Sequence, residues 1–208
     1  MKVTKFVHSC LLIEDQEKTV LIDPGEFSVE LLKPRLAAIP KLDYLLITHE
    51  HFDHMDIPLV KEIVARFKPK VISTASVREM LRKEGIEVQT TGDDYIEIES
   101  VPHESISPLG QASQNVLFHV GGKLTHPGDS HSFSNTKDIL ALPIQAPWGS
   151  TINAVNLAFK LKPKKVIPIH DWHWRNEARE SMYPRLKESF LTNGIEFISS
   201  QDSIPFDA

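Results

Sequence analysis

Two adjoining segments constrain most strongly how this chain can fold: Asp43–Thr48 (DYLLIT) and His49–His54 (HEHFDH). The first is a short, almost continuous apolar run, which is typical of a strand buried on both faces. The second is a polar loop with three imidazoles and two carboxylates in six residues. Because a loop at a strand end can turn alternate side chains toward one point, we expect a sheet edge that gathers these groups.

The spacing of this loop favours metal binding. His49 and His51 are two residues apart and could hold one metal ion together, while Asp53 and His54 follow the turn and could hold a second ion. Neutral imidazole suits zinc, iron and nickel, and carboxylate suits harder ions such as manganese. For one isolated histidine, a solvated loop residue is the better explanation. Four ligand-type residues in HxHxDH spacing after an apolar strand reverse that preference.

One loop cannot complete two metal sites, since a catalytic zinc site usually takes three protein ligands and a water molecule. Three further ligand-type residues each follow a predicted strand: His103, Asp129 and His170. Strand ends converge at one edge of a sheet, where sites in such folds usually lie. We therefore expect these three side chains to join the histidine-rich loop.

The composition narrows the classes of protein. Ten histidines stand against a single cysteine, Cys10, in 208 residues, which excludes an intramolecular disulfide framework and leaves nitrogen and oxygen as metal ligands. With 41% hydrophobic residues, the chain can bury a core and is not disordered. Its net charge of −5 argues against nucleic acid as a partner, because such a footprint would be basic.

Periodicity and turn signals predict a mixed α/β chain. The predicted strands are Lys2–His8, Cys10–Glu14, Thr19–Asp23, Asp43–Thr48, Lys70–Ser73, Glu87–Thr90, Tyr95–Val101, Asn115–Val120, Lys123–His126, Ile139–Gln145, Lys165–Ile169 and Ile195–Ile198. The predicted helices are Ile57–Phe67, Ala75–Glu84, Ser150–Leu161 and Glu177–Thr192. Antiparallel strands come first and then strands alternate with helices, which favours mixed sheets covered by helices in a layered sandwich. We expect one domain over residues 1–208, since no repeat or linker is visible.

The N-terminus has no apolar run of the kind found in signal peptides, and no apolar segment approaches 18 residues. We therefore expect a cytoplasmic protein without a membrane partner. The sequence leaves the oligomeric state open, and a homo-oligomer is compatible with it.

These motifs together resemble the metallo-β-lactamase superfamily. The shared elements are the HxHxDH loop, a lone histidine, Gly128-Asp129 in a turn, and a histidine after an apolar strand, and they span the chain from about His8 to Trp172. Thr19–Pro24 (TVLIDP) is also similar to the strand ending in aspartate that precedes the metal loop. The resemblance implies an α/β (α+β) fold, a four-layer αβ/βα sandwich with the site at one edge of its two sheets.

The resemblance also implies a role for each ligand and two divalent metal ions, with zinc preferred and manganese or iron as alternatives. The implied set is His49, His51 and His103 for the first ion, Asp53, His54 and His170 for the second, and Asp129 as the bridge. Asp23 would steady the loop histidines by hydrogen bonds, as carboxylates behind metal ligands commonly do.

Departures from the family pattern favour one branch. Cys10 is in the wrong place for the secreted β-lactamases that use a cysteine ligand. The chain is most similar to the compact branch that includes L-ascorbate-6-phosphate lactonase and related metal-dependent hydrolases. Phe6–Ile13 is similar to the opening of that branch, where a histidine lies near the second strand.

The implied chemistry is metal-assisted hydrolysis of an ester, lactone or phosphoester of a small soluble substrate. Two metal ions would share a hydroxide and lower its pKa toward about 7, and Asp53 could orient this nucleophile. Three histidines are candidates for the general acid: His8, His126 and His173. Two alternatives remain, a nuclease or phosphodiesterase of the same fold and a non-catalytic metal-binding regulatory module.

Several residues near the implied ligands could line a substrate pocket: His126, Trp148, Trp172, His173 and Arg175. Arginine suits a phosphate or carboxylate group. The alternative for the tryptophans is that they cover the core beneath a loop.

Overall fold

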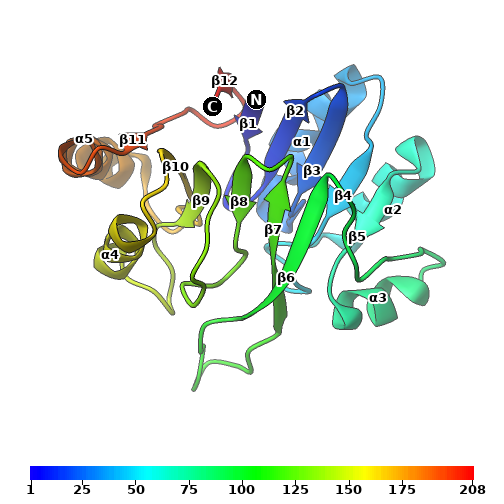
Figure 1. Ribbon diagram of the computed structural model, residues 1–208. Helices are drawn as coiled ribbons and strands as arrows, with labels where there is room; N and C mark the ends of the chain where they lie inside the picture. The colour runs from blue at the N-terminus through cyan, green and yellow to red at the C-terminus, as the bar shows by residue number, and fades with distance from the viewer.

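Two six-stranded sheets face each other in the computed structural model, which describes residues 1–208 (Figure 1). The first sheet has the spatial order β12 (Pro205–Asp207), β1 (Lys2–Lys5), β2 (Leu11–Asp15), β3 (Lys18–Ile22), β4 (Tyr44–Leu46) and β5 (Lys70–Ile72). The second has the order β11 (Glu196–Phe197), β10 (Lys165–Ile169), β9 (Ile139–Pro143), β8 (Leu124–His126), β7 (Gln114–Val120) and β6 (Ile96–Pro102). Both sheets combine parallel and antiparallel pairs.

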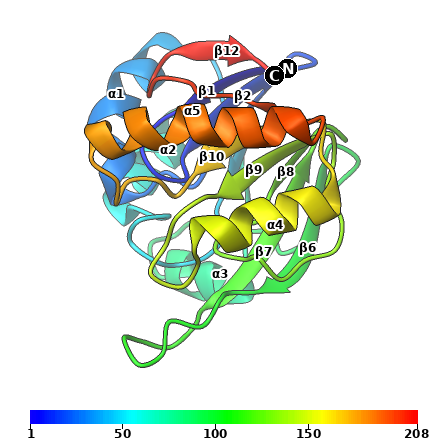
Figure 2. The same ribbon diagram turned by 90° about the vertical axis from the view of Figure 1, so that its left-hand side faces the viewer.

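Helices cover the outer face of each sheet (Figures 1 and 2). The first sheet carries α1 (Val29–Ala38), α2 (Ile57–Phe67) and α3 (Ala75–Arg82), and the second carries α4 (Thr151–Leu161) and α5 (Asn176–Thr192). A short 3-10 turn, η1 (Glu26–Ser28), precedes α1. None of these helices combines the length and apolar composition needed to cross a membrane. The predicted α/β layered sandwich is confirmed.

The apolar core is divided into three layers because side chains alternate along each strand. Leu12 and Leu21 face the helices of the first sheet, whereas their neighbour Ile13 lies between the two sheets. In β7, Phe118 joins the layer between the sheets and Leu117 packs against α4 and α5. Each sheet is thus buried on both faces, and its strand ends remain as the place for a polar site.

Strand direction brings the polar loops to one edge. In the first sheet β3 and β4 are parallel, and β1 runs in the same direction because it is two antiparallel steps from β3. In the second sheet β8, β9 and β10 are parallel, and two antiparallel steps give β6 the same direction. Strands of one direction end at the same edge of their sheet, and the segments that follow these strands carry the predicted ligands. The ligands of each sheet therefore lie at one edge.

Several elements differ from the sequence prediction, and three of them are instructive. Glu87–Thr90 is not a strand, because it makes a single bridge, Ile72 to Gln89, at the edge of the sheet. Helix α1 was not predicted, since Pro34 interrupts its pattern and it buries only Leu32 and Leu36. Strand β12 was also missed, because its three residues are mostly exposed and pair only with β1.

Candidate metal centre

Asp23 holds the histidine-rich loop in place. Its carboxylate accepts hydrogen bonds from the Thr48 backbone N–H at 2.7 Å and from the Thr48 hydroxyl at 2.8 Å. The same carboxylate lies 2.8 Å from Nδ1 of His54. Asp23 is fully buried and connects the end of β3 to both ends of the loop. Asp23 therefore occupies the position expected of a carboxylate that orients the loop histidines by hydrogen bonds.

The predicted ligands come together in two adjacent clusters. The ligand atoms within each cluster all lie within 4.8 Å of one another. The first cluster is His49, His51, His103 and Asp129, and the second is His8, Asp53, His54 and His170. All seven residues of the implied ligand set are present, and the division between clusters follows the sequence expectation, with His8 added.

Five of the six clustered histidines, all except His8, have one ring nitrogen held by a hydrogen-bond partner. The contacts are His49 Nδ1 with the Thr48 hydroxyl at 3.0 Å, His51 Nε2 with the Ser113 hydroxyl at 2.8 Å, His54 Nδ1 with Asp23 at 2.8 Å, His103 Nδ1 with the Glu104 carbonyl at 2.6 Å, and His170 Nδ1 with the Gln145 carbonyl at 2.9 Å. Such contacts fix ring orientation and tautomer behind a metal ligand. The other nitrogen of each ring is left for the cluster.

The inward-facing atoms of the clusters are buried and make no hydrogen bonds, and their close polar contacts are with one another and with the other cluster carboxylate oxygens. They are Nε2 of His8, His49, His54, His103 and His170, together with Oδ1 of Asp129. Buried polar groups are otherwise paired in proteins, because leaving one unpaired costs about 1–3 kcal/mol. A concentration of such atoms at one point, each behind a positioned ring, fits metal ligation and disfavours simple packing.

Asp129, a member of the first cluster, also contacts the second. Its Oδ1 is 3.0 Å from Nε2 of His54, and its Oδ2 is 3.3 Å from Nε2 of His170 and 3.5 Å from Nε2 of His103. Trp148 adds an indole N–H donor at 3.0 Å from Oδ2. One carboxylate thus reaches imidazoles of both clusters, which is the placement that a bridging ligand requires.

The carboxylates of the centre favour the binding of cations. The carboxylates of Asp23, Asp53 and Asp129 form ion pairs only with histidines, since no lysine or arginine lies within 4.0 Å of them. Burial opposes charge on His54, but Asp129 and Asp23 outweigh it and raise the pKa of His54 well above its usual value. Burial likewise opposes ionisation of Asp129, but His170 and His54 hold its pKa well below the usual range. Buried carboxylates of this kind are paired or bind metal.

A glycine allows the loops to approach each other. Gly25 packs against the backbone of the histidine-rich loop, and a Cβ atom at this position would overlap the carbonyl group of Asp53. The neighbouring Glu26 N–H donates to the Phe52 carbonyl at 2.9 Å, which ties the two segments together. The chain therefore needs glycine here for steric reasons.

Replacing Gly25 with alanine should displace the histidine-rich loop and destabilise the fold by about 1–3 kcal/mol, the usual cost of overpacking. Urea unfolding and zinc titration of G25A would measure both effects. G110A is the matched control, because its new Cβ would meet only the end of the Ile106 side chain. Wild-type stability and zinc affinity in G25A would contradict this account of the loop contact.

Four of the five predicted pocket residues are half-buried or exposed: Trp148, Trp172, His173 and Arg175. Trp148 is half-buried, with its ring centroid 5.4 Å from that of His170. Trp172 and His173 are exposed, and the His173 ring lies 6.0 Å from that of His170. Arg175 is exposed at the residue before α5. These placements are compatible with an opening beside His170.

His126 lies in a different place from the pocket position expected. It is fully buried, its Nε2 contacts the Ser9 carbonyl at 2.9 Å, and its Nδ1 accepts from the Gly128 N–H at 3.3 Å. Both ring nitrogens are thus occupied beneath the centre. His126 packs between the sheets and neither faces the opening nor holds a free nitrogen for proton transfer.

Phe27, Phe52 and Trp172 form an aromatic wall beside the second cluster, of which sequence reasoning named Trp172 and missed the two phenylalanines. The rings of Phe27 and Trp172 are stacked at 3.9 Å, and Phe52 meets Phe27 edge-on at 5.7 Å. Phe27 also meets His8 edge-on at 5.6 Å. Phe52 could have been noticed between the ligands of its loop. Phe27 carries no local signal, because its segment shows no pattern.

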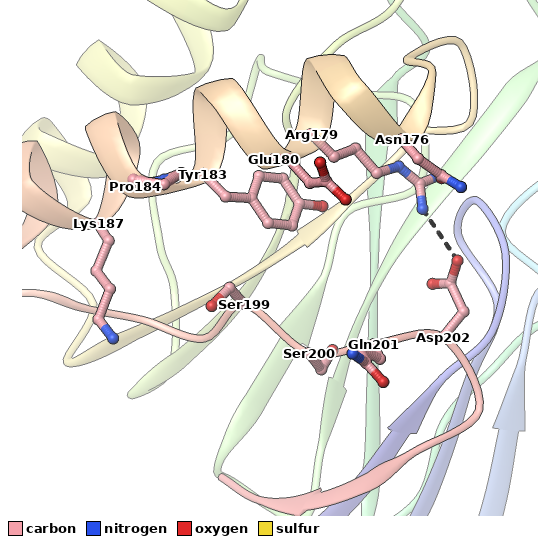
Figure 3. A pocket seen from close by; sticks show the side chains of 10 residues that line it. All are labelled: Asn176, Arg179, Glu180, Tyr183, Pro184, Lys187, Ser199, Ser200, Gln201 and Asp202. Carbon is pink, nitrogen blue, oxygen red and sulfur yellow. Dashed lines mark hydrogen bonds and ion pairs between the residues drawn. The ribbon is translucent and has the colours of Figure 1, made fainter.

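A groove elsewhere on the molecule has a different chemistry. It encloses about 660 Å³ between α5 and residues 199–202, and it is crossed by an ion pair of Arg179 and Asp202 at 3.0 Å (Figure 3). None of its lining residues belongs to the two clusters. We therefore place the functional site at the clusters.

Comparisons with known proteins agree with this geometry. The sequence matches the Beta-lactamase superfamily domain over residues 2–170. Protein Rv0786c of Mycobacterium tuberculosis is 29% identical over 99% of this chain and 100% of its own length. A UPF0173 metal-dependent hydrolase of Nanoarchaeum equitans is 29% identical over 84% of this chain and 85% of its own length. Igni18, a metallo hydrolase from Ignicoccus hospitalis, shares the fold with a TM-score of 0.71 at 21% identity, covering 100% of this chain and 98% of that chain.

Proposed function

The chain belongs to the β-lactamase superfamily, and from this premise we propose that it is a metal-dependent hydrolase acting on an ester, lactone or phosphoester of a small soluble substrate. The observation that carries the proposal is the set of buried, unpartnered imidazole and carboxylate atoms at one point. Relatives named metal-dependent hydrolases support the general class.

The proposed ligands divide as the clusters do. The first ion would be held by His49, His51, His103 and Asp129, and the second by Asp53, His54, His170 and the shared Asp129. Zinc suits this mixture of imidazole and carboxylate, and iron or manganese are the alternatives. Two bound ions would supply Lewis acidity and a water molecule of lowered pKa.

The chain's own residues have separate tasks in this proposal. Asp53 would orient the attacking water, and the Trp148 indole holds the Asp129 carboxylate in position. Of the three candidate proton donors, His8 belongs to the second cluster and His173 lies beside it, whereas His126 is enclosed. Arg175, which is exposed and follows His170 by five positions, is the cationic candidate for an anionic substrate group.

The aromatic wall would contact the apolar part of a substrate. Phe52 and Trp172 are 60% and 44% exposed, although large aromatic side chains are usually buried. Both lie next to ligand residues, because Phe52 precedes Asp53 and Trp172 follows His170 by two positions. An apolar surface beside polar catalytic groups is the usual composition of a small-molecule site.

Replacing Trp172 with alanine should raise KM by about tenfold while leaving kcat nearly unchanged, because it removes apolar contact that substrate and transition state share. Steady-state kinetics with the best substrate of the panel below would measure this. L191A is the matched control, since Leu191 is a 70% exposed apolar residue of α5. An unchanged KM in W172A would remove the aromatic wall from the substrate site.

A substrate panel tests the proposal directly. Metal-reconstituted protein would be assayed with carboxylic esters, lactones, phosphomonoesters and a bis-aryl phosphate, with H49A as the inactive control. Hydrolysis of one class that H49A abolishes would support the proposal. Hydrolysis of the bis-aryl phosphate and of RNA, lost in H51A, would favour a nuclease instead. Metal-loaded protein that is inactive on the whole panel would favour a non-catalytic binding module.

A further inference from the structure

His8 is held in an unusual backbone conformation between β1 and β2. Its φ of 66° lies in the left-handed region, which non-glycine residues adopt rarely and at a cost. The turn is closed by the Phe6 N–H, which donates to the Cys10 carbonyl at 2.8 Å. The His8 carbonyl in turn accepts from the His170 N–H at 3.1 Å. The backbones of His8 and of a proposed ligand are therefore joined directly.

The His8 ring lies inside the second cluster. Its Nε2 is 3.1 Å from Oδ2 of Asp53, and its ring centroid is 3.9 Å from that of His170 and 5.3 Å from that of His54. The residue is fully buried. All four ligand-type atoms of this group lie within 4.8 Å of one another, which is a separation that ligands of a single ion can have.

Neither ring nitrogen of His8 makes a hydrogen bond, and Nε2 has only the ion-pair contact with Asp53. The other two buried histidines outside the implied ligand set differ in this respect. His126 uses both nitrogens, and Nδ1 of His119 contacts the Thr125 hydroxyl at 2.8 Å. Like the proposed ligands, His8 turns a buried Nε2 without a hydrogen bond toward carboxylate and imidazole groups, which the packed histidines do not. It differs from those ligands in that its Nδ1 has no partner either.

We infer that His8 is a ligand of the second metal ion, together with Asp53, His54 and His170. This assignment rests on the proposed function, since it presupposes metal binding. It makes the second ion richer in nitrogen ligands than the family resemblance implies. A nitrogen that ligates a metal cannot deliver a proton, so His173 becomes the candidate for the general acid.

Metal content gives the first readout. The variant H8A should retain the first ion and bind the second about a hundredfold or more weakly, at least the loss expected for a residue that only supports a ligand. Zinc titration against a competing chelator would measure this, and H173A is the matched control, because His173 is exposed and lies outside the cluster.

Direct coordination needs a readout that a merely structural role would not move. Cobalt-loaded H8C should show a thiolate-to-cobalt charge-transfer band in the near ultraviolet, whereas wild type, with only the buried Cys10, and H173C should not. Anomalous diffraction from the zinc-loaded wild type should place His8 Nε2 about 2.0–2.1 Å from the second ion. This measurement decides the matter if H8C does not fold or take up cobalt.

The outcomes separate this assignment from the proposed function. A cobalt-loaded H8C without the band, or a His8 nitrogen more than about 3 Å from the ion, would overturn the assignment and leave the hydrolase proposal standing. A wild-type chain that binds no metal would overturn both.

Discussion

Replacing Asp129 with asparagine is expected to lower kcat/KM by about a thousandfold or more. A bridging carboxylate acts on both metal ions, so its removal should cost several kcal/mol of transition-state stabilisation, which corresponds to that factor. The substitution keeps the size of the side chain but removes its charge. Three imidazole nitrogens lie within 3.5 Å of this carboxylate, so both clusters should lose metal affinity. Kinetics and metal analysis of the same D129N preparation would measure the two effects together.

D138N is the matched control for D129N. Asp138 is an exposed acid that pairs with Lys164 at 2.8 Å on the surface, and its replacement should leave activity and metal content unchanged. A D129N variant with the activity and metal content of the wild type would exclude the bridging role.

The second large effect is on stability. Replacing Lys5 with methionine should lower the free energy of unfolding by about 3–5 kcal/mol, because it leaves a buried carboxylate without its main partner. Lys5 Nζ lies 2.9 Å from both carboxylate oxygens of Asp171, and both residues are buried. Arg179, at 3.5 Å from Asp171, retains part of the compensation, so we expect a value near the lower end. Urea unfolding at pH 7 would measure the change.

The effect of K5M should depend on pH. Burial opposes ionisation of Asp171, but Lys5 and Arg179 hold its pKa below the usual value in the folded wild type. The ion pair therefore contributes stability above the unfolded pKa of about 3.9, and this contribution is lost as the pH falls through the lower folded value. The stability difference between wild type and K5M should shrink below about pH 4.

K164M is the control for K5M, since Lys164 forms an exposed pair with Asp138 and exposed pairs contribute about 0–1 kcal/mol. Equal losses of unfolding free energy in K5M and K164M would show that the buried pair contributes no more to stability than an exposed pair. Because Asp171 directly follows His170, K5M should also weaken metal binding, which zinc titration would detect.

The ligand positions could be predicted because they follow strands. His103, Asp129 and His170 each come after a strand of one direction, so recognising the strands was enough to expect their meeting. His126 shows where this reasoning fails. It also ends a strand, but its side chain points into the layer between the sheets and bonds to Ser9. Strand ends are local features, whereas the side of the sheet that a terminal residue faces depends on register.

Contacts between segments that are far apart in the sequence could not be predicted from local sequence patterns. Lys5 lies in a strand whose alternation suggests nothing about burial, yet it pairs with Asp171, 166 residues away. Ser113 contacts His51 from the loop after His103, and Trp148 contacts Asp129 from the segment before α4. The aromatic wall likewise depends on tertiary packing, because Phe27 stacks on Trp172 from a distant part of the chain. Such partners arise from the fold, so only the structure could identify them.

The metal content of the purified chain tests the central claim most directly. The protein would be reconstituted separately with zinc, manganese and iron, freed of unbound metal and analysed by mass spectrometry, with H49A and H54A each removing a ligand of one cluster. The account predicts about two equivalents per chain with at least one metal and about one in each variant, as a dinuclear site requires. A wild-type chain that retains one equivalent or none with every metal would contradict it.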